Sequence, residues 1–322
     1  MSDSFFDVII IGAGPIGLSC GIEAIRRNLS HLILEKGCLV NSIFNYPTNM
    51  TFFSTSDRLE IGEVPFVSHG DKPTRREALE YYRRVKQSWN LDVHTFETVN
   101  GISKDNEIFY IISDKGNYLC RNVIIATGFF DKPNYLNIPG ENLPKVKHYF
   151  NEAHPYAYLD IIVVGAANSA VDVALETYRR GSNVTMVIRE DRIKDNVKYW
   201  VKPDIDNRIK EGAIKAYFNS ELTSIRNNDV EIKTPSGIIQ LKNDFVFAMT
   251  GYHSDYNFLM TAGVEIHKDI NRTPVFNEAT FETNIKGLFI AGVVCGGMDN
   301  GKWFIENSRF HAQSIFDYLR NK

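Results

Sequence analysis

A glycine-rich turn near the start of the chain has the residue types and the spacing to bind a dinucleotide. The strand expected at residues 7–11 is followed by Gly12, Gly14 and Gly17, and Pro15 opens the helix behind them. In this pattern the first glycine permits a tight turn, the second admits a pyrophosphate, and the third lets helix and strand pack closely. The helix N-terminus then favours the phosphates. The alternative is a glycine turn without a ligand, but the complete context favours a nucleotide.

An acidic residue at the end of the next expected strand, residues 31–35, indicates which dinucleotide the turn would bind. Glu35 stands at this position and Lys36 follows it. A carboxylate there accepts hydrogen bonds from both ribose hydroxyls and repels a 2′-phosphate. The first site is therefore predicted to bind FAD or NAD rather than NADP.

A second, degenerate version of the turn follows the strand expected at residues 161–164. Gly165 keeps the first glycine position, and alanines, which are still small enough for close approach, occupy the other two. Asn168 and Ser169 add polar groups at the start of the next helix, where they could reach a phosphate.

The end of the strand that follows, residues 183–189, indicates NADPH for this second site. Arg189 stands where a glutamate would select NAD, and Arg192 is close behind it. An arginine in this position can hold a 2′-phosphate. The alternative makes both arginines solvated surface charges, and Glu190 between them weakens the positive charge.

The order of these elements predicts an α/β fold with two Rossmann-like domains, the second inserted in the first. The strand-like segments 123–128 and 247–252 end in small residues, which suits a chain that changes domain beside a flat ligand or simply a strand followed by a turn. A closing strand at residues 287–292 and a final helix would complete the first domain. We therefore expect an FAD-binding domain at 1–129 and 249–322, and an NADPH-binding domain at 130–248.

The composition excludes several classes of protein. A chain of 322 residues with 43% hydrophobic and 23% charged residues suits two globular domains and is unlike a disordered chain. A net charge of −3 gives no overall attraction to nucleic acid or to an acidic membrane. No segment resembles a signal peptide or a membrane span, which predicts a cytoplasmic protein without a membrane partner.

The four cysteines are scattered and form no Cys-x-x-Cys pair. We therefore expect neither a metal site nor a vicinal redox dithiol. In a reducing cytosol the simplest interpretation is a set of buried thiols.

Together these motifs resemble the two-domain thioredoxin-reductase-like flavoproteins, in order and over essentially the whole chain. Segments 41–47, 51–56, 148–156 and 304–307 narrow the resemblance to the YpdA group of bacillithiol disulfide reductases. The resemblance implies a homodimeric enzyme with an FAD that is reduced by NADPH.

The resemblance also implies which residues line each cofactor. The adenosine end of FAD would contact Gly12, Gly14, Pro15, Gly17, Glu35 and Lys36. The rest of FAD would contact Asn45, Tyr46, Phe53, Thr127, Gly128, Gly292 and Val293. NADPH would contact Gly165, Asn168, Ser169, Arg189 and Arg192.

The chain departs from these families at three points. Without a Cys-x-x-Cys dithiol, it is not expected to reduce thioredoxin by that route. Val293 replaces the aspartate of the closing motif, an absence that the YpdA group shares. Ile16 stands where YpdA proteins usually carry a cysteine, and isoleucine cannot supply the thiolate that a helix N-terminus would activate.

Cys295 is the candidate replacement, because it follows the closing strand in a loop expected beside the flavin. The hypothesis is a redox thiol, and the alternative is a small residue packed beside the cofactor. Candidates for proton transfer, with structural hydrogen bonding as the alternative, are His148, His154 and His311. Candidates for contact with a cofactor ring, with ordinary packing as the alternative, are Tyr252, Lys302 and Trp303.

The predicted function is an NADPH-dependent FAD oxidoreductase that passes electrons to an acceptor. The first candidate for this acceptor is a low-molecular-weight disulfide such as bacillithiol disulfide, and the second is a small redox protein. One alternative is a ferredoxin– or flavodoxin–NADP reductase, which needs no cysteine. A flavin monooxygenase is disfavoured, because segment 131–155 lacks an intact Phe-x-Gly-x-x-x-His motif. A flavin-binding redox sensor without catalytic activity is a further alternative.

Overall fold

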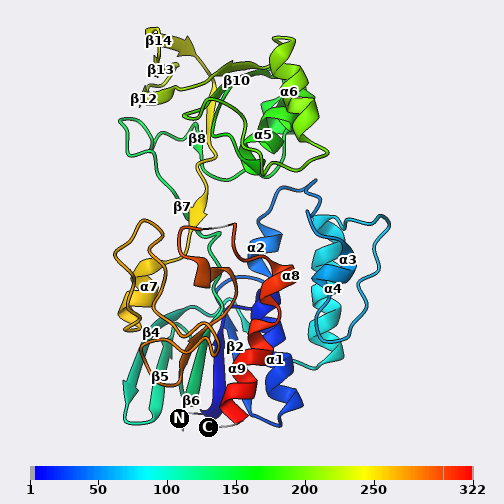
Figure 1. Ribbon diagram of the computed structural model, residues 1–322, viewed down its shortest axis with the longest axis vertical. Helices are drawn as coiled ribbons and strands as arrows, with labels where there is room; N and C mark the ends of the chain where they lie inside the picture. Colours follow the sequence, from blue (N-terminus) through cyan, green and yellow to red (C-terminus); the bar gives the residue numbers. More distant parts are fainter. Residues whose placement is uncertain (1–3, 300, 321–322) are drawn as a thin grey trace. The chain divides into compact units, whose positions relative to one another are not determined.

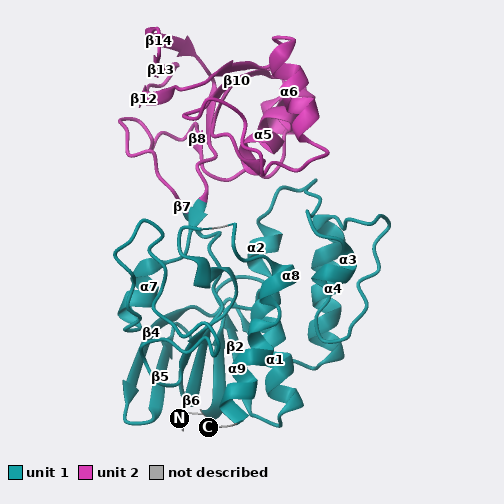
Figure 2. Ribbon diagram, in the orientation of Figure 1, with its two compact units in different colours: residues 1–132, 252–322 teal, residues 133–251 magenta. Residues whose placement is uncertain are grey.

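The computed structural model describes residues 4–299 and 301–320, and the chain divides into two compact units (Figure 2). Unit 1 comprises Met1–Lys132 and Tyr252–Lys322, and unit 2 comprises Pro133–Gly251. The chain passes from one unit to the other after residues 132 and 251, in each case three residues later than the sequence suggested. The reason is that Phe130 and Asp131 still interact within unit 1, through the ring of Tyr252 at 4.5 Å and the ammonium of Lys36 at 2.7 Å.

A seven-stranded sheet forms the centre of unit 1 (Figure 1). Its order is β3-β2-β1-β6-β5-β4, and β17 also pairs with β6. The strands are β1 (Ser4–Ile11), β2 (His31–Glu35), β3 (Val93–Thr95), β4 (Val99–Asp105), β5 (Ile108–Ser113), β6 (Asn117–Ile125) and β17 (Leu288–Ile290). β3, β2, β1, β6 and β17 are joined by parallel pairing, whereas β4, β5 and β6 pair antiparallel.

The strand β6 explains how the sheet is assembled from distant parts of the chain. Its first half pairs with β5, and its second half pairs with β17, where Leu288 lies opposite Val123. The closing strand therefore extends the sheet of unit 1, as expected. β1 begins at Ser4, earlier than the sequence suggested, because residues 4–6 pair with residues 118–120 of β6. Residues 8–11 are buried, as is typical of a parallel strand that is covered on both faces.

Helices cover the sheet of unit 1. Helix α1 packs against α9 and against β1 and β2, and Figure 1 shows α1 and α9 side by side. The helices are α1 (Pro15–Arg26), α2 (Asn41–Phe44), α3 (Ser56–Leu59), α4 (Arg75–Ser88), α7 (Tyr256–Thr261), α8 (Ile305–Ser308) and α9 (His311–Arg320). The segment of Cys295, expected as a loop, is a short 3₁₀ helix, Gly292–Gly296.

Unit 2 is a smaller α/β unit with a five-stranded parallel sheet of order β11-β10-β9-β15-β8. These strands are β8 (Val146–Lys147), β9 (Asp160–Val164), β10 (Asn183–Val187), β11 (Lys215–Tyr217) and β15 (Phe245–Ala248). An antiparallel sheet comprises β12 (Glu221–Ile225), β13 (Asp229–Thr234) and β14 (Gly237–Lys242). The helices are the 3₁₀ helix His154–Tyr156, α5 (Asn168–Tyr178) and α6 (Lys202–Lys210).

Two short strands, β7 (Lys132–Pro133) and β16 (Tyr252–His253), pair where the chain passes between the units. Within residues 4–299 and 301–320, no helix has the length and apolar character needed to cross a membrane.

Candidate functional site

In unit 1, the turns that the sequence singled out meet at one edge of the parallel sheet. Ile11 at the end of β1 pairs with Ile125 of β6, and Ile125 pairs with Ile290 of β17. The three strands therefore end side by side, and the segments that follow them are 12–17, 127–128 and 292–293. This edge, at the carboxyl ends of the strands, is where open α/β sheets bind their ligands.

Two of the three fingerprint glycines are required by close packing. A Cβ atom on Gly17 would lie 1.8 Å from the carbonyl oxygen of Gly12. Gly12 has φ of +107°, and a Cβ there would lie 2.6 Å from the carbonyl oxygen of Ala126. These contacts bring α1 onto β1 and the segment of Thr127 against the turn, so both roles predicted from the spacing are present.

The second glycine faces open space and so provides the room that a pyrophosphate needs. A Cβ atom on Gly14 would meet no atom within 4 Å. Gly14 is also the N-cap of α1 and supplies no side chain to cap it, while Pro15 occupies the first turn. First-turn N–H groups without a side-chain cap suit an anionic ligand. The turn therefore fits the phosphates of a dinucleotide.

The carboxylate of Glu35 lies beside this turn at the end of β2. Its two oxygens accept hydrogen bonds from the backbone N–H groups of Ala13 at 2.8 Å and Gly37 at 2.9 Å. Burial raises the pKa of Glu35, and these two backbone donors oppose the shift. Each oxygen retains accepting capacity for a ribose hydroxyl. The ammonium of the next residue, Lys36, forms an ion pair with the carboxylate of Asp131, with 2.7 Å between nitrogen and oxygen.

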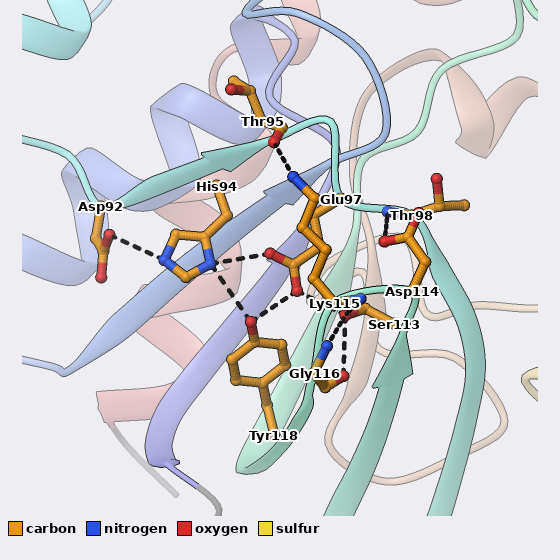
Figure 3. Close-up of polar contacts among 10 residues, drawn as sticks. All are labelled: Asp92, His94, Thr95, Glu97, Thr98, Ser113, Asp114, Lys115, Gly116 and Tyr118. Carbon is orange, nitrogen blue, oxygen red and sulfur yellow. Dashed lines mark hydrogen bonds and ion pairs between the residues drawn. The ribbon is translucent and has the colours of Figure 1, made fainter.

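A polar cluster forms around the buried carboxylate of Glu97 in unit 1 (Figure 3). The carboxylate of Glu97 is 3% exposed and accepts hydrogen bonds from the hydroxyls of Ser113 and Tyr118, both at 2.6 Å. The Nδ1 atom of His94 lies 3.0 Å from the same carboxylate. Burial opposes ionisation of Glu97, but these three hydrogen bonds outweigh it and lower its pKa.

The backbone beside this cluster holds the Glu35 turn in place. The N–H of Glu97 donates to the carbonyl of Glu35, and the N–H of Phe96 donates to the carbonyl of Gly37, both at 2.9 Å. These hydrogen bonds fix the backbone of the turn at Glu35 and Gly37, and the Glu97 side chain fixes the backbone that donates them. Sequence reasoning missed Glu97, because no local pattern marks an acid whose partners come from three strands.

The aromatic and polar residues expected along the rest of FAD have varied surroundings. Tyr46 packs edge-on against Phe130 at 4.9 Å, and burial raises its pKa to about 12. Asn45 donates from its side chain to the carbonyl of Asn41, which is a local contact. Phe53 is 55% exposed. Tyr46 is thus half-buried against the core of unit 1, whereas Asn45 and Phe53 lie on the surface.

The closing motif packs directly on the fingerprint. A Cβ atom on Gly292 would lie 3.1 Å from Cγ1 of Ile16, and one on Gly128 would lie 3.9 Å from Cγ2 of Val293. Gly128, Gly292 and Val293 therefore lie close together at this edge of the sheet. Ile16 contributes an apolar contact to this edge of the sheet where a cysteine would have contributed a thiol.

Cys295 lies in surroundings that keep its thiol protonated. The side chain is 1% exposed, and its sulfur lies 4.0 Å from Nδ1 of His311. Burial raises the pKa of Cys295, and burial lowers the pKa of His311 to about 4. A neutral imidazole cannot stabilise a thiolate, so this pair is unsuited to nucleophilic attack on a disulfide.

Replacing Cys295 with serine is expected to leave turnover with a disulfide acceptor within about twofold of the original, because a protonated buried thiol contributes packing only. The measurement is NADPH consumption by holoenzymes of matched flavin content. A variant that binds FAD normally but no longer reduces the acceptor would instead give Cys295 a redox role.

The second glycine turn, in unit 2, has a similar construction to the first. Gly165 has φ of +124°, and a Cβ there would lie 2.6 Å from the carbonyl oxygen of Met249. Ala167 is the N-cap of α5 and supplies no side-chain cap, while Ser169 in the first turn is exposed. This helix end therefore also fits a phosphate group.

The two arginines expected beside NADPH lie on the surface of unit 2. Arg192 pairs with Asp195 at 3.3 Å, and both side chains are mostly exposed. Arg189 is exposed and makes no ion pair within the described residues. β10 ends at Val187, two residues earlier than the sequence suggested, so Arg189 lies just beyond the strand, where its guanidinium is available to a 2′-phosphate.

The remaining candidates are dispersed. Nε2 of His148 lies 3.6 Å from Glu141 in unit 2, and His154 is an exposed residue of the 3₁₀ helix 154–156. In unit 1, Trp303 packs edge-on against His311 at 4.4 Å, and the ammonium of Lys302 lies over its ring at 5.4 Å.

Comparison with known proteins decides the family. Residues 9–292 match the family model described as pyridine nucleotide-disulphide oxidoreductase. The chain belongs to this family. Membership confirms the predicted pair of Rossmann-like domains, the oxidoreductase class, and FAD and NADPH as the cofactors.

Individual members of the family are similar over nearly their whole length. The bacilliredoxin reductase Bdr of Bacillus subtilis (strain 168) is 47% identical over 309 residues, which cover 95% of each chain. The solved structure of bacillithiol disulfide reductase Bdr (YpdA) from Staphylococcus aureus is 42% identical, covers 99% of each chain and has a TM-score of 0.96. A Lactococcus lactis thioredoxin reductase, 20% identical with a TM-score of 0.77 over 98% of each chain, shares the fold. The resemblance to the YpdA group is therefore confirmed.

Proposed function

We propose that this oxidoreductase binds FAD in unit 1 and NADPH in unit 2 and passes electrons from NADPH to a bacillithiol-derived disulfide. The observation that carries the proposal is the similarity to the Bdr proteins, at 42–47% identity across both units. Relatives named ferredoxin–NADP reductase are only 23–27% identical.

In this proposal the chain binds and orients the cofactors. When bound, FAD supplies two-electron redox chemistry between a nicotinamide and a disulfide. Gly14 and the N-terminus of α1 hold the pyrophosphate, and Glu35 binds the ribose. In unit 2, the N-terminus of α5 holds the pyrophosphate of NADPH, and Arg189 faces its 2′-phosphate.

The state of the cysteines supports an acceptor that takes electrons without a mixed disulfide to this chain. All four are free, and burial raises the pKa of Cys20, Cys38, Cys120 and Cys295. None of them is therefore activated as a thiolate. The acceptor in this proposal is then either bacillithiol disulfide itself or a mixed disulfide between bacillithiol and a small redox protein of the bacilliredoxin kind. A homodimer and a cytoplasmic location belong to the same proposal and rest on the family resemblance.

The test uses the purified yellow holoenzyme under anaerobic conditions. NADPH is expected to bleach the flavin more effectively than NADH does. Bacillithiol disulfide, or bacilliredoxin in mixed disulfide with bacillithiol, is then expected to restore the oxidised spectrum and sustain NADPH consumption. Reoxidation by ferredoxin or flavodoxin but by neither disulfide would replace the proposal with a ferredoxin–NADP reductase. Reduction by NADH and NADPH at equal rates would contradict the assignment of NADPH.

A further inference from the structure

The segment that carries the basic residues of unit 2, residues 189–198, is fastened to the glycine turn at several points. We call this segment the basic loop. The N–H of Lys194 donates to the carbonyl of Ala166 at 3.1 Å. Within the loop, Ile193 and Val197 are buried in the core of unit 2. The basic loop therefore has a defined conformation beside the start of α5, although its charged side chains are exposed.

Asn168 makes two of these attachments with a single side chain. Its Oδ1 accepts a hydrogen bond from the N–H of Lys198 at 2.9 Å, and its Nδ2 donates to the carbonyl of Asn196 at 3.2 Å. Both ends of the amide are thus engaged with the backbone of the basic loop. Asn168 occupies the first position of α5, next to Ser169, whose exposed hydroxyl makes no hydrogen bond within the described residues.

An ion pair strengthens the same attachment. The ammonium of Lys198 lies 2.8 Å from the carboxylate of Asp172, and these side chains are only 12% and 21% exposed. Asp172 lies one turn along α5 from Asn168. Lys198 is therefore attached to α5 through both its backbone and its side chain, which fixes the C-terminal end of the basic loop.

We propose that Asn168 is a positioning residue for NADPH selectivity, which acts by fastening the part of the basic loop that follows Arg192, so that this guanidinium faces the 2′-phosphate. Arg189, at the other end of the loop, is held instead through the hydrogen bond from the N–H of Asn219 to the carbonyl of Glu190 at 3.0 Å. This inference rests on the proposed binding of NADPH in unit 2. A guanidinium binds a phosphate most strongly when its direction is fixed, since its donors form a rigid fork. The sequence suggested a different role for Asn168, direct contact with a phosphate.

The two roles predict different effects on cofactor discrimination. The pyrophosphate is common to NAD⁺ and NADP⁺, so a residue that contacts it weakens both cofactors equally. The 2′-phosphate belongs to NADP⁺ alone, so a residue that positions the basic loop weakens NADP⁺ more. The ratio of the two dissociation constants therefore separates the roles, and a general loss of structure would not change it selectively.

The experiment is calorimetric titration of the oxidised holoenzyme with NADP⁺ and with NAD⁺, which requires no turnover. Asn168→Ala is expected to reduce the preference for NADP⁺ about fivefold or more, the scale of one weakened charged hydrogen bond. Alanine is favourable in a helix, so α5 itself should persist, and a melting curve verifies this. Asn168→Ser, which is also too short to reach the basic loop, serves as the second variant and should show the same direction.

The matched control is Ser169→Ala, at the neighbouring position of the same helix end. It is expected to weaken both cofactors by the same factor and to leave the preference unchanged. If Asn168→Ala also weakens both equally, or changes neither, the positioning role is wrong while the proposed function stands. If the unaltered holoenzyme shows no preference for NADP⁺, the assignment of NADPH fails and this inference fails with it.

Discussion

Purified Gly17→Ala protein is expected to be nearly colourless and to unfold more easily than the original. The added Cβ would lie 1.8 Å from the carbonyl oxygen of Gly12, a backbone atom that cannot move without displacing the turn. To relieve such a clash, α1 must move away from β1, and we expect this to lower the free energy of unfolding by about 3 kcal/mol. Because the separation would also move the N-terminus of α1, FAD binding should fail together with stability. Flavin absorbance per protein and the melting temperature measure the two effects.

Gly14→Ala is the matched control, because it should separate cofactor binding from folding. Gly14 has φ of −71° and ψ of 176°, a conformation open to alanine, and the new Cβ would meet no atom within 4 Å. The FAD-free protein should therefore keep its stability to within about 1 kcal/mol. Its affinity for FAD should fall about tenfold or more, since a methyl group would occupy the space beside the pyrophosphate.

The pair of variants tests the location of the FAD site itself. If both lose FAD but only Gly17→Ala loses stability, the open space at Gly14 is where the cofactor approaches the backbone. Normal FAD affinity in the Gly14→Ala protein would show that the pyrophosphate lies elsewhere, and the assignment of unit 1 would then be wrong.

The parts of the site that sequence reasoning anticipated are those with local requirements. The turn around Gly12, Gly14 and Gly17 needs a strand before it and a helix after it, and all three are neighbours in the chain. Glu35 follows one strand later, at a position that parallel pairing of β1 and β2 determines. The closing strand β17 was also anticipated, and it pairs in parallel with the second half of β6, beyond the residues of β6 that pair with β5.

The parts that sequence reasoning did not anticipate depend on contacts between distant segments. Glu97 acquires its partners from β3, β5 and β6, and its effect on Glu35 passes through backbone hydrogen bonds. Asn168 lies where a phosphate contact is plausible from its position, yet its amide is engaged by the basic loop. Cys295 stood out as a thiol near the closing motif, but its environment is decided by the packing of α9.

The free energy of unfolding is expected to decrease by about 3 kcal/mol as the pH falls from 6.5 to about 4, on account of His311 alone. The side chain is 3% exposed, and its Nδ1 accepts a hydrogen bond from the N–H of Gly292 at 3.1 Å. Its ring stacks on Phe281 at 4.0 Å. Burial lowers the pKa of His311 to about 4, whereas the ordinary value of 6.5 applies to the unfolded chain.

The sign follows from which state binds the proton first. Well above pH 6.5 the imidazole is neutral in both states, and the contribution of His311 to stability is complete. Below that pH the unfolded chain takes up a proton while the folded protein does not, so unfolding becomes more favourable until the folded pKa is reached. The measurement is urea unfolding at about pH 8 and about pH 4 with FAD at a fixed excess, because bound cofactor also stabilises the folded state.

Two variants identify His311 as the source of this dependence. His311→Asn and His311→Gln both remove the titrating group, so each should lose less stability on acidification than the original protein does. The asparagine oxygen can replace Nδ1 as acceptor for the N–H of Gly292, whereas the glutamine oxygen extends past it. The asparagine variant should therefore be the more stable of the two at about pH 8, by roughly 1 kcal/mol. If the pH dependence is unchanged in both variants, other groups cause the acid sensitivity. One such group is His31, whose pKa is also lowered by burial.

Protonation of His311 should also affect the cofactor, because it removes the acceptor that holds Gly292 in the closing motif. Acid should therefore weaken FAD binding in the original protein more than in the asparagine variant.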